Sequence, residues 1–235
     1  MKIYDIQELL RKNSYPGRGI IIGRTADNKN AVAAYFIMGR SKNSRNRVFM
    51  KTEDGIRTEA FDPAAMVDPS LIIYHPVRDF CGHTIVTNGD QTDTIRDFMA
   101  KGSDMRAALK TREFEPDRPN YTPRISALIY PDGSYSMSVL KALDADGDCC
   151  CRYLFEYDRP KAGLGHFIHT YISDGDPLPS FAGEPERVIM DCETPEQLAD
   201  ILWDSLDDDN KVSLYVRYIN LESGKSRVVI KNKNV

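Results

Sequence analysis

The segments of this chain that favour β-strands follow one another directly, and helical segments separate runs of strands instead of single strands. Strand-forming stretches lie at residues 18–25, 31–40, 47–51, 71–74 and 84–87, and then at 124–130, 134–143, 150–157, 166–173, 187–191, 211–218 and 227–230. A parallel doubly wound sheet needs a helix between successive strands, whereas strands joined by short turns pair antiparallel. The order of segments therefore predicts an α+β fold with antiparallel sheets.

Local signals place the helices between these runs. Asp5 is a capping residue for a helix that ends near residue 12. The spacing of apolar residues predicts two adjacent helices that begin near Thr92 and Asp104. Thr194 and Gln197 form a capping box at the start of a further helix. Two sheets packed face to face, with helices outside, would bury both runs of strands, so we expect one domain over residues 1–235.

Composition and charge exclude several classes of protein. The net charge of −4 argues against a nucleic-acid binder, which would neutralise phosphates with a basic surface. The apolar runs are shorter than the roughly 20 residues of a membrane-spanning helix, so we expect no membrane association. An acidic residue at position 5 does not suit a secretory signal, and five cysteines, three of them consecutive, suit neither a disulfide framework nor a zinc site. We therefore expect a cytoplasmic protein.

A dense basic segment lies between two apolar strands. Residues 40–47, with the sequence RSKNSRNR, hold four cations, two amides and two hydroxyls and no acid. Guanidinium groups bind phosphate in a two-pronged fashion, so Arg40, Arg45 and Arg47 with Ser41 predict a phosphate clamp on a loop. A solvated basic loop is the alternative interpretation.

Two further segments carry polar groups at strand ends. Residues 15–19 (YPGRG) place Arg18 at the start of a strand between two glycines, which allow close approach of another group. Residues 88–95 (NGDQTDTI) form a strand-turn-helix junction whose N–H groups and short side chains would face one cleft. Helix capping by Asp90 or Thr92 is the alternative there. Capping does not account for Asn88.

The segment before the strand at 124–130 supplies carboxylates. Arg124 lies at the start of that strand, preceded by Glu113, Glu115 and Asp117, which are candidates for proton transfer. The alternative is a structural ion pair with the arginine. The chain contains no P-loop and no dinucleotide-binding fingerprint.

Four of these motifs together resemble the archaeal-type IMP cyclohydrolase family. They are YPGRG at 15–19, GRS at 39–41 with NR at 46–47, NGDQTDTI at 88–95 and TPRI at 122–125. The resemblance covers residues 15–130. It implies a four-layer α-β-β-α sandwich of mainly antiparallel sheets like that of the N-terminal nucleophile hydrolases, without their self-processing. It also implies the last step of purine synthesis, in which 5-formamidoimidazole-4-carboxamide ribotide loses water and closes to inosine monophosphate.

The resemblance also implies roles for residues of this chain. Tyr74 and Asn88 would donate hydrogen bonds to the tetrahedral oxygen, and Glu115 would exchange protons through a water. Arg18 would anchor the substrate and belongs with this catalytic group. The implied substrate-binding residues are Arg40, Ser41, Arg45, Arg47, Gly89, Asp90, Thr92 and Arg124. No metal or other cofactor is expected.

The only expected partner is therefore a small nucleotide substrate, with no nucleic acid and no membrane. The oligomeric state is open, a homo-oligomer included. One alternative is a non-catalytic purine-nucleotide-binding protein of the same fold. Another is binding of a small RNA through residues 40–47, which the acidic net charge disfavours.

Overall fold

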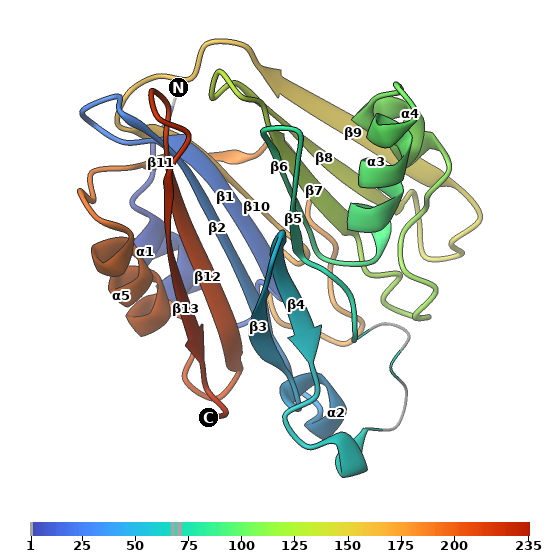
Figure 1. Cartoon of the computed structure of the whole chain (residues 1–235). Helices are drawn as coiled ribbons and strands as arrows, with labels where there is room; N and C mark the ends of the chain where they lie inside the picture. The colour runs from blue at the N-terminus through green and yellow to red at the C-terminus, as the bar shows by residue number, and fades with distance from the viewer. Residues whose placement is uncertain (1, 67–68, 70–71) are drawn as a thin grey trace.

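The computed structural model describes residues 2–66, 69 and 72–235, and these form two antiparallel sheets with helices on their outer faces (Figure 1). The first sheet has six strands in the order β11 (Glu186–Ile189), β10 (Leu164–His169), β1 (Arg18–Arg24), β2 (Asn30–Met38), β12 (Lys211–Asn220) and β13 (Ser226–Asn232). The second has seven strands in the order β3 (Val48–Thr52), β4 (Gly55–Glu59), β5 (Val77–Phe80), β6 (His83–Thr87), β7 (Arg124–Ile129), β8 (Tyr135–Ala142) and β9 (Cys150–Tyr157). The predicted α+β class with antiparallel sheets is confirmed.

Alternating side chains explain why the two sheets pack face to face. Successive residues of a strand point to opposite faces, so Ile20 and Ile22 of β1 lie in the core between the sheets, while Ile21 faces outward. From the second sheet, Val86 and Met137 enter the same core. The buried strands are apolar on both faces because each sheet is covered on both sides.

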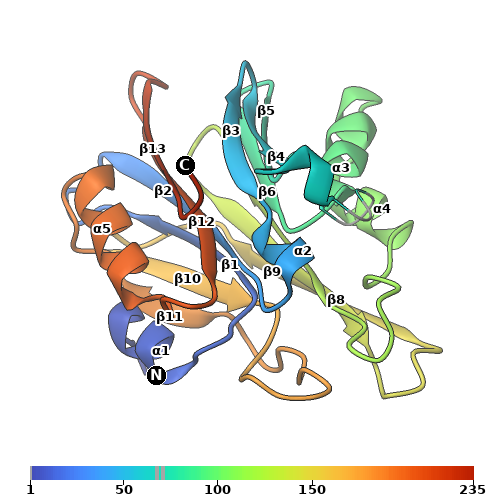
Figure 2. The ribbon, with the colours of Figure 1, turned by 90° about the horizontal axis from the view of Figure 1, so that it is seen from below.

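Helices cover the outer face of each sheet. The helices are α1 (Ile6–Lys12), α2 (Lys42–Arg45), α3 (Gln91–Ala100), α4 (Met105–Lys110) and α5 (Pro195–Ser205), with a 3₁₀ turn at Pro63–Ala65. Figures 1 and 2 show α1 and α5 against the first sheet and α3 and α4 against the second. Leu10 and Leu202 pack onto the first sheet, and Ile95 and Leu109 onto the second. No helix within the described residues is long and apolar enough to cross a membrane.

The two sheets are joined along one side by polar contacts. The side-chain amide of Asn232 on β13 accepts a hydrogen bond from the Phe49 N–H at 2.8 Å and donates one to the Phe49 carbonyl at 3.2 Å. It thereby satisfies backbone groups of β3, the edge strand of the other sheet. Nearby, the Arg217 guanidinium of β12 donates to the Asp79 carboxylate of β5 at 2.5 Å.

The structure confirms most predicted elements and corrects two. The Asp5 cap, the hairpin of β1 and β2, and the capping box of Thr194 and Gln197 are all present. The predicted strand at 71–74 is wrong for residues 72–74, which form a turn, while residue 71 lies outside the described residues. The Thr58 hydroxyl holds this turn by donating to the Ile72 carbonyl, and the strand begins only at β5.

The second correction concerns the basic segment. Its first part is not an irregular loop but the helical turn α2, because Ser41 and Ser44 form a capping box that satisfies the N–H groups of this turn. The strands β4 and β5 were not predicted from the sequence. β4 carries Arg57 and Glu59 among its five residues, and this weakens the hydrophobic signal of a strand.

We expect substitution of Leu202 by alanine to destabilise the fold by about 2–5 kcal/mol, since this fully buried side chain anchors α5 on the first sheet. Urea unfolding followed by circular dichroism measures the change. Leu143→Ala is the control, because Leu143 is 62% exposed and its loss should alter stability by less than about 0.5 kcal/mol. Equal effects of the two substitutions would contradict the assigned packing.

Candidate active site

A polar pocket of about 370 Å³ opens at the end of the sandwich where β1 begins and β2 ends. Its walls come from segments that are far apart in the sequence. The lining residues are Tyr15, Arg18, Arg40, Ser41, Asn43, Ser44, Arg47, Ile72, Glu115, Asp117, Asn120, Tyr171 and Leu178. The pocket therefore brings together the motif at 15–19, the basic segment and the carboxylates before β7.

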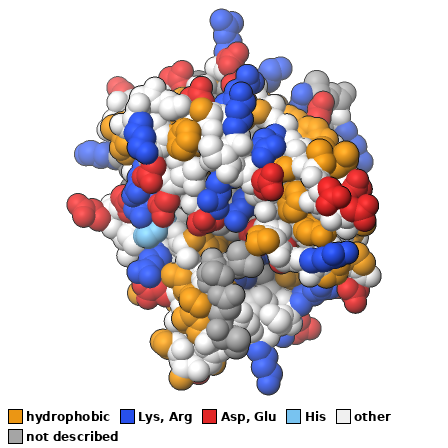
Figure 3. Space-filling view, turned by 90° about the vertical axis from the view of Figure 1, so that its right-hand side faces the viewer, with side chains coloured by type: hydrophobic (Ala, Val, Ile, Leu, Met, Phe, Trp, Pro, Cys, Tyr) orange, Lys and Arg blue, Asp and Glu red, His pale blue; other side chains and the backbone are white. Residues whose placement is uncertain are grey.

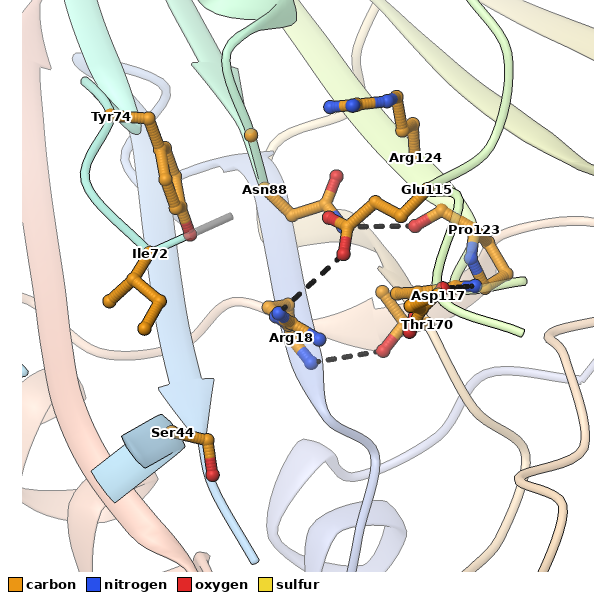
Figure 4. A network of polar contacts seen from close by, with 12 residues as sticks. Arg18, Ser44, Ile72, Tyr74, Asn88, Glu115, Asp117, Pro123, Arg124 and Thr170 are labelled. Atoms are coloured by element: carbon orange, nitrogen blue, oxygen red, sulfur yellow. Dashed lines mark hydrogen bonds and ion pairs between the residues drawn. The ribbon is translucent and has the colours of Figure 1, made fainter. Parts of the chain in front are cut away.

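Arg18 lies at the centre of this group of residues (Figure 4). Its guanidinium Nη2 is 3.9 Å from the Glu115 carboxylate, and its backbone N–H donates to the Thr170 hydroxyl at 3.1 Å. The buried Nε of Arg18 has no hydrogen-bond partner among the described residues. A buried guanidinium with an unsatisfied donor is suited to binding an anion.

The two glycines that flank Arg18 let neighbouring side chains approach its backbone closely. A side chain at Gly17 would put its Cβ 2.3 Å from the Thr170 hydroxyl, and one at Gly19 would collide with the Phe36 ring at 2.3 Å. Gly17 also has a φ of +77°, a conformation that favours glycine. The interpretation of these glycines as sites of close approach is confirmed.

Glu115 is a buried carboxyl group, exposed by only 2%. Burial raises the pKa of Glu115, and the positive charges of Arg18 and Arg124 oppose part of this rise. A carboxyl group with a raised pKa is more readily protonated near neutral pH, as a group that donates and accepts protons must be. The two neighbouring candidates are engaged elsewhere: Glu113 lies 3.8 Å from Arg152, and Asp117 accepts from the Thr122 backbone N–H at 2.7 Å.

Arg47 adds a second buried guanidinium. Its hydrogen bonds go to the backbone carbonyls of Ser44 and Met38, at 2.8 Å and 3.2 Å, and no ion pair with an acid forms within the described residues. Burial lowers the pKa of Arg47, and the positive charge of Arg18 lowers it further. Two neighbouring cations, of which one has no acidic partner, create a positive potential in the pocket.

Arg40 and the hydroxyls of α2 complete the cationic end of the pocket. The Arg40 guanidinium lies 5.0 Å from the centre of the Tyr15 ring and donates to the Asp174 carboxylate at 2.6 Å. Ser41 caps α2, and the Ser44 hydroxyl lies 3.0 Å from the Ser41 hydroxyl. Both serines line the pocket.

Tyr74 stands beside this space. Its hydroxyl lies 2.8 Å from the hydroxyl of Tyr35, and both side chains are buried. Burial raises the pKa of Tyr35, and the neighbouring Tyr74 raises it further, so Tyr35 stays protonated and holds the Tyr74 hydroxyl in place. Tyr74 is also one of the groups close enough to Arg18 to raise the pKa of its guanidinium.

Asn88 is fully buried and holds the start of β7. Its amide oxygen accepts hydrogen bonds from the Ile125 N–H at 2.8 Å and from the Gln91 amide at 3.0 Å. Its amide nitrogen donates to the Pro123 carbonyl at 2.9 Å. Because an amide nitrogen carries two N–H groups, one remains for a further acceptor.

Seven of the predicted site residues are not among those that line this pocket: Arg45, Tyr74, Asn88, Gly89, Asp90, Thr92 and Arg124. Arg124 donates to Asp90 at 2.8 Å and to Gln91 at 2.7 Å, and Gly89 leaves room for it, since a Cβ there would lie 2.5 Å from the guanidinium. Asp90 is at the cap position of α3 but makes no side-chain capping bond.

Thr92 and Arg45 bind neighbouring groups of the protein. The Thr92 hydroxyl donates to the Gly89 carbonyl at 3.1 Å. The Arg45 guanidinium donates to the Gly39 carbonyl at 2.8 Å and to the Asn210 amide oxygen at 3.2 Å. These bonds account for the positions of both side chains.

Some lining residues were not predicted from the sequence. Tyr171 stacks on Tyr15 with ring centres 5.9 Å apart, and its hydroxyl contacts that of Thr122. Burial raises the pKa of Tyr171 to about 12. No local pattern marks Tyr171, whereas Ser44 and Asn43 lie inside the basic segment and could have been chosen with it.

Comparison with known proteins shows the family of this chain. The family model described as IMP cyclohydrolase-like protein matches residues 15–224. An IMP cyclohydrolase from Methanococcus aeolicus is 27% identical over 194 residues, which are 81% of this chain and 88% of the relative. IMP cyclohydrolases from Halobacterium salinarum and Methanococcus maripaludis are 29% and 32% identical over 132 and 126 residues. These two matches cover 54% and 52% of this chain, and 63% and 61% of the relatives.

The fold and the pocket define an α+β protein of two antiparallel sheets with a buried cationic site. The match over residues 15–224 is more specific, and it shows that the chain belongs to the IMP cyclohydrolase-like family. The resemblance carried by the four motifs is thereby confirmed.

We expect Gly17→Ala to destabilise the protein more than Gly224→Ala. Both glycines have a positive φ, +77° and +68°, and an alanine there costs about 1–2 kcal/mol in backbone strain. Only Gly17 faces a collision, because nothing lies within 4 Å of a Cβ at Gly224. Thermal unfolding measures both variants, and equal losses would show that Gly17 is not needed for close approach.

The raised pKa of Glu115 predicts a pH dependence of stability. A carboxyl group whose pKa is higher in the folded than in the unfolded chain stabilises the fold at low pH, and this contribution is lost as pH rises through the folded pKa. Glu115→Gln removes this titration. The variant should therefore gain stability relative to the natural protein from about pH 4 to about pH 8, as measured by urea unfolding. The opposite trend would mean that the ion pair with Arg18 dominates.

Proposed function

We propose that this protein is an IMP cyclohydrolase that closes 5-formamidoimidazole-4-carboxamide ribotide to inosine monophosphate in purine synthesis, in the cytoplasm. The observation that carries the proposal is the meeting of Arg18, Arg47 and Glu115 in one pocket. A cationic end suits the phosphate of the ribotide, and a buried carboxyl group suits the proton transfers of ring closure. The names of the curated relatives support the same activity.

The phosphate would bind at the end of the pocket formed by Arg18, Arg40 and Arg47. Guanidinium groups donate several hydrogen bonds to phosphate oxygens, and the Ser41 and Ser44 hydroxyls lie beside them. Arg40 would exchange its bond with Asp174 for one to the phosphate. The clamp holds the ribotide at a fixed depth, which brings its carboxamide and formyl groups into near-attack geometry.

The proposed chemistry takes place beside Glu115. The carboxamide nitrogen attacks the formyl carbon, and the formyl oxygen later leaves as water with one proton from the carboxamide nitrogen and one from the formamide nitrogen. Glu115, whose pKa is raised by burial, would receive and return these protons through a water. Tyr74 and the remaining N–H of Asn88 would donate to the oxygen of the tetrahedral intermediate. Ring closure involves no change of oxidation state.

The arrangement of layers supports a more specific assignment of the fold. We propose that α1 with α5, the two sheets, and α3 with α4 make the four layers of the N-terminal nucleophile hydrolase type. Three apolar clusters fill the three spaces between these layers, as a four-layer sandwich requires. In this assignment the chain uses no terminal nucleophile.

Charge on the surface does not favour the alternative of RNA binding. On the face shown in Figure 3, lysine and arginine side chains are interspersed with acidic ones and form no single basic surface. Arg45 and Arg47 of the basic segment donate hydrogen bonds to the protein itself. A non-catalytic nucleotide-binding protein remains the alternative that the following experiment distinguishes.

Purified protein supplied with the formylated ribotide should produce the absorbance change of ring closure. Arg18→Ala should lower kcat/KM about 100-fold, through loss of the clamp. Glu115→Gln should lower kcat about 100-fold or more while inosine monophosphate still binds, because it removes a proton-transfer group and not an anchor.

Arg227→Ala is the control, since Arg227 is exposed and pairs with Glu196 on α5, outside the pocket. It should retain the activity of the natural protein. Tight binding of inosine monophosphate without any turnover would overturn the enzymatic proposal and select the non-catalytic binding protein.

A further inference from the structure

A second cavity lies on the outer face of the other sheet. It has a volume of about 350 Å³ and is formed between α4 and the strands β8 and β9. It shares no lining residue with the first pocket. Volumes of this size are within the range of small-molecule sites, which is about 300–1,000 Å³.

Three cations surround this cavity. Arg106 and Lys110 are four residues apart on α4, so they lie on the same side of the helix, and both are exposed. Neither forms an ion pair with any acid within the described part of the chain. The third cation, Arg152 of β9, is fixed at the cavity by donating to the carbonyls of Leu109 and Arg112, at 3.2 Å and 2.7 Å.

A buried hydroxyl without a partner lies in the cavity wall. Ser138 of β8 is 1% exposed, and its Oγ has no hydrogen-bond partner among the described residues. The adjacent outward-facing residue Leu140 belongs to the apolar cluster under α3 and α4, as does Leu109. A polar atom in such surroundings is unfavourable unless it forms a hydrogen bond. The contacts within the protein therefore do not explain why a serine hydroxyl is buried at this position.

Ser126 of β7 provides an internal comparison. It lies opposite Ser138 in the sheet, is equally buried and also lacks a partner, but it is not part of the cavity wall. Ser136, the next outward-facing serine of β8, has its hydroxyl 3.2 Å from that of Tyr130. Of these three serines, only Ser138 therefore combines an unsatisfied hydroxyl with a place in the cavity wall.

We propose that this cavity is a second ligand site, for an aromatic monophosphate that carries a hydrogen-bond acceptor on the far side of its ring. Arg106 and Lys110 bind the phosphate, Leu109 and Leu140 contact the ring, and the Ser138 hydroxyl donates to the acceptor. The inference is independent of the activity proposed for the first pocket.

Two matched probes test this arrangement by calorimetry. 4-Nitrophenyl phosphate has a phosphate, a ring and acceptor oxygens opposite the phosphate, whereas phenyl phosphate lacks the acceptor. The natural protein should bind 4-nitrophenyl phosphate about threefold to tenfold more tightly, the gain of one hydrogen bond. Ser138→Ala should remove this preference, while Ser126→Ala should keep it. Arg106→Gln with Lys110→Gln should weaken both probes about tenfold.

Arg18→Ala removes an anchor of the first pocket, so binding of either probe that persists in this variant belongs to the second cavity. The proposal fails if neither probe binds, or if the preference for the nitro compound survives in Ser138→Ala. It also fails if Ser126→Ala loses the preference to the same extent, or if Arg18→Ala abolishes binding. Circular dichroism of each variant confirms that the fold is retained.

Discussion

Packing between the inner faces of the two sheets is the constraint on which the rest of the structure depends. Tyr35 of the first sheet stacks on Phe49 of the second with ring centres 5.7 Å apart, and the alternating residues around them exclude water. This contact sets the separation of the sheets. The geometry of the pocket depends on this separation, because Arg18 comes from the first sheet, while Arg47 directly precedes β3 of the second and Glu115 lies in the segment between α4 and β7.

Buried charge gives the pocket its chemical character. Removing a guanidinium from water is unfavourable unless hydrogen bonds or an opposite charge compensate for it. For Arg47 the compensation comes from backbone carbonyls, and for Arg18 from a single carboxylate at 3.9 Å, which burial itself tends to protonate. The site therefore holds more positive than negative charge before any ligand arrives. A bound anion would neutralise this excess positive charge.

The sequence predicted those features that depend on neighbouring residues. The capping box at Thr194, the turn between β1 and β2 and the close approach at Gly17 are local, and each was found. The directions of Arg124 and Arg45 were not predictable, because they depend on hydrogen bonds to Asp90 and Asn210. Arg45 and Asn210 are 165 positions apart in the chain. Tyr171 was missed for the same reason, since its stacking partner, Tyr15, lies 156 positions earlier in the chain.

The amide of Asn232 has a consequence for how the molecule can move. It closes the gap between β13 and β3, and the ion pair of Arg217 with Asp79 lies on the same flank. These contacts hold the two sheets together along the border formed by β13 and β3. At the opposite border, Tyr157 of β9 stacks on His166 of β10 with ring centres 3.8 Å apart, so the sandwich resists opening from either side.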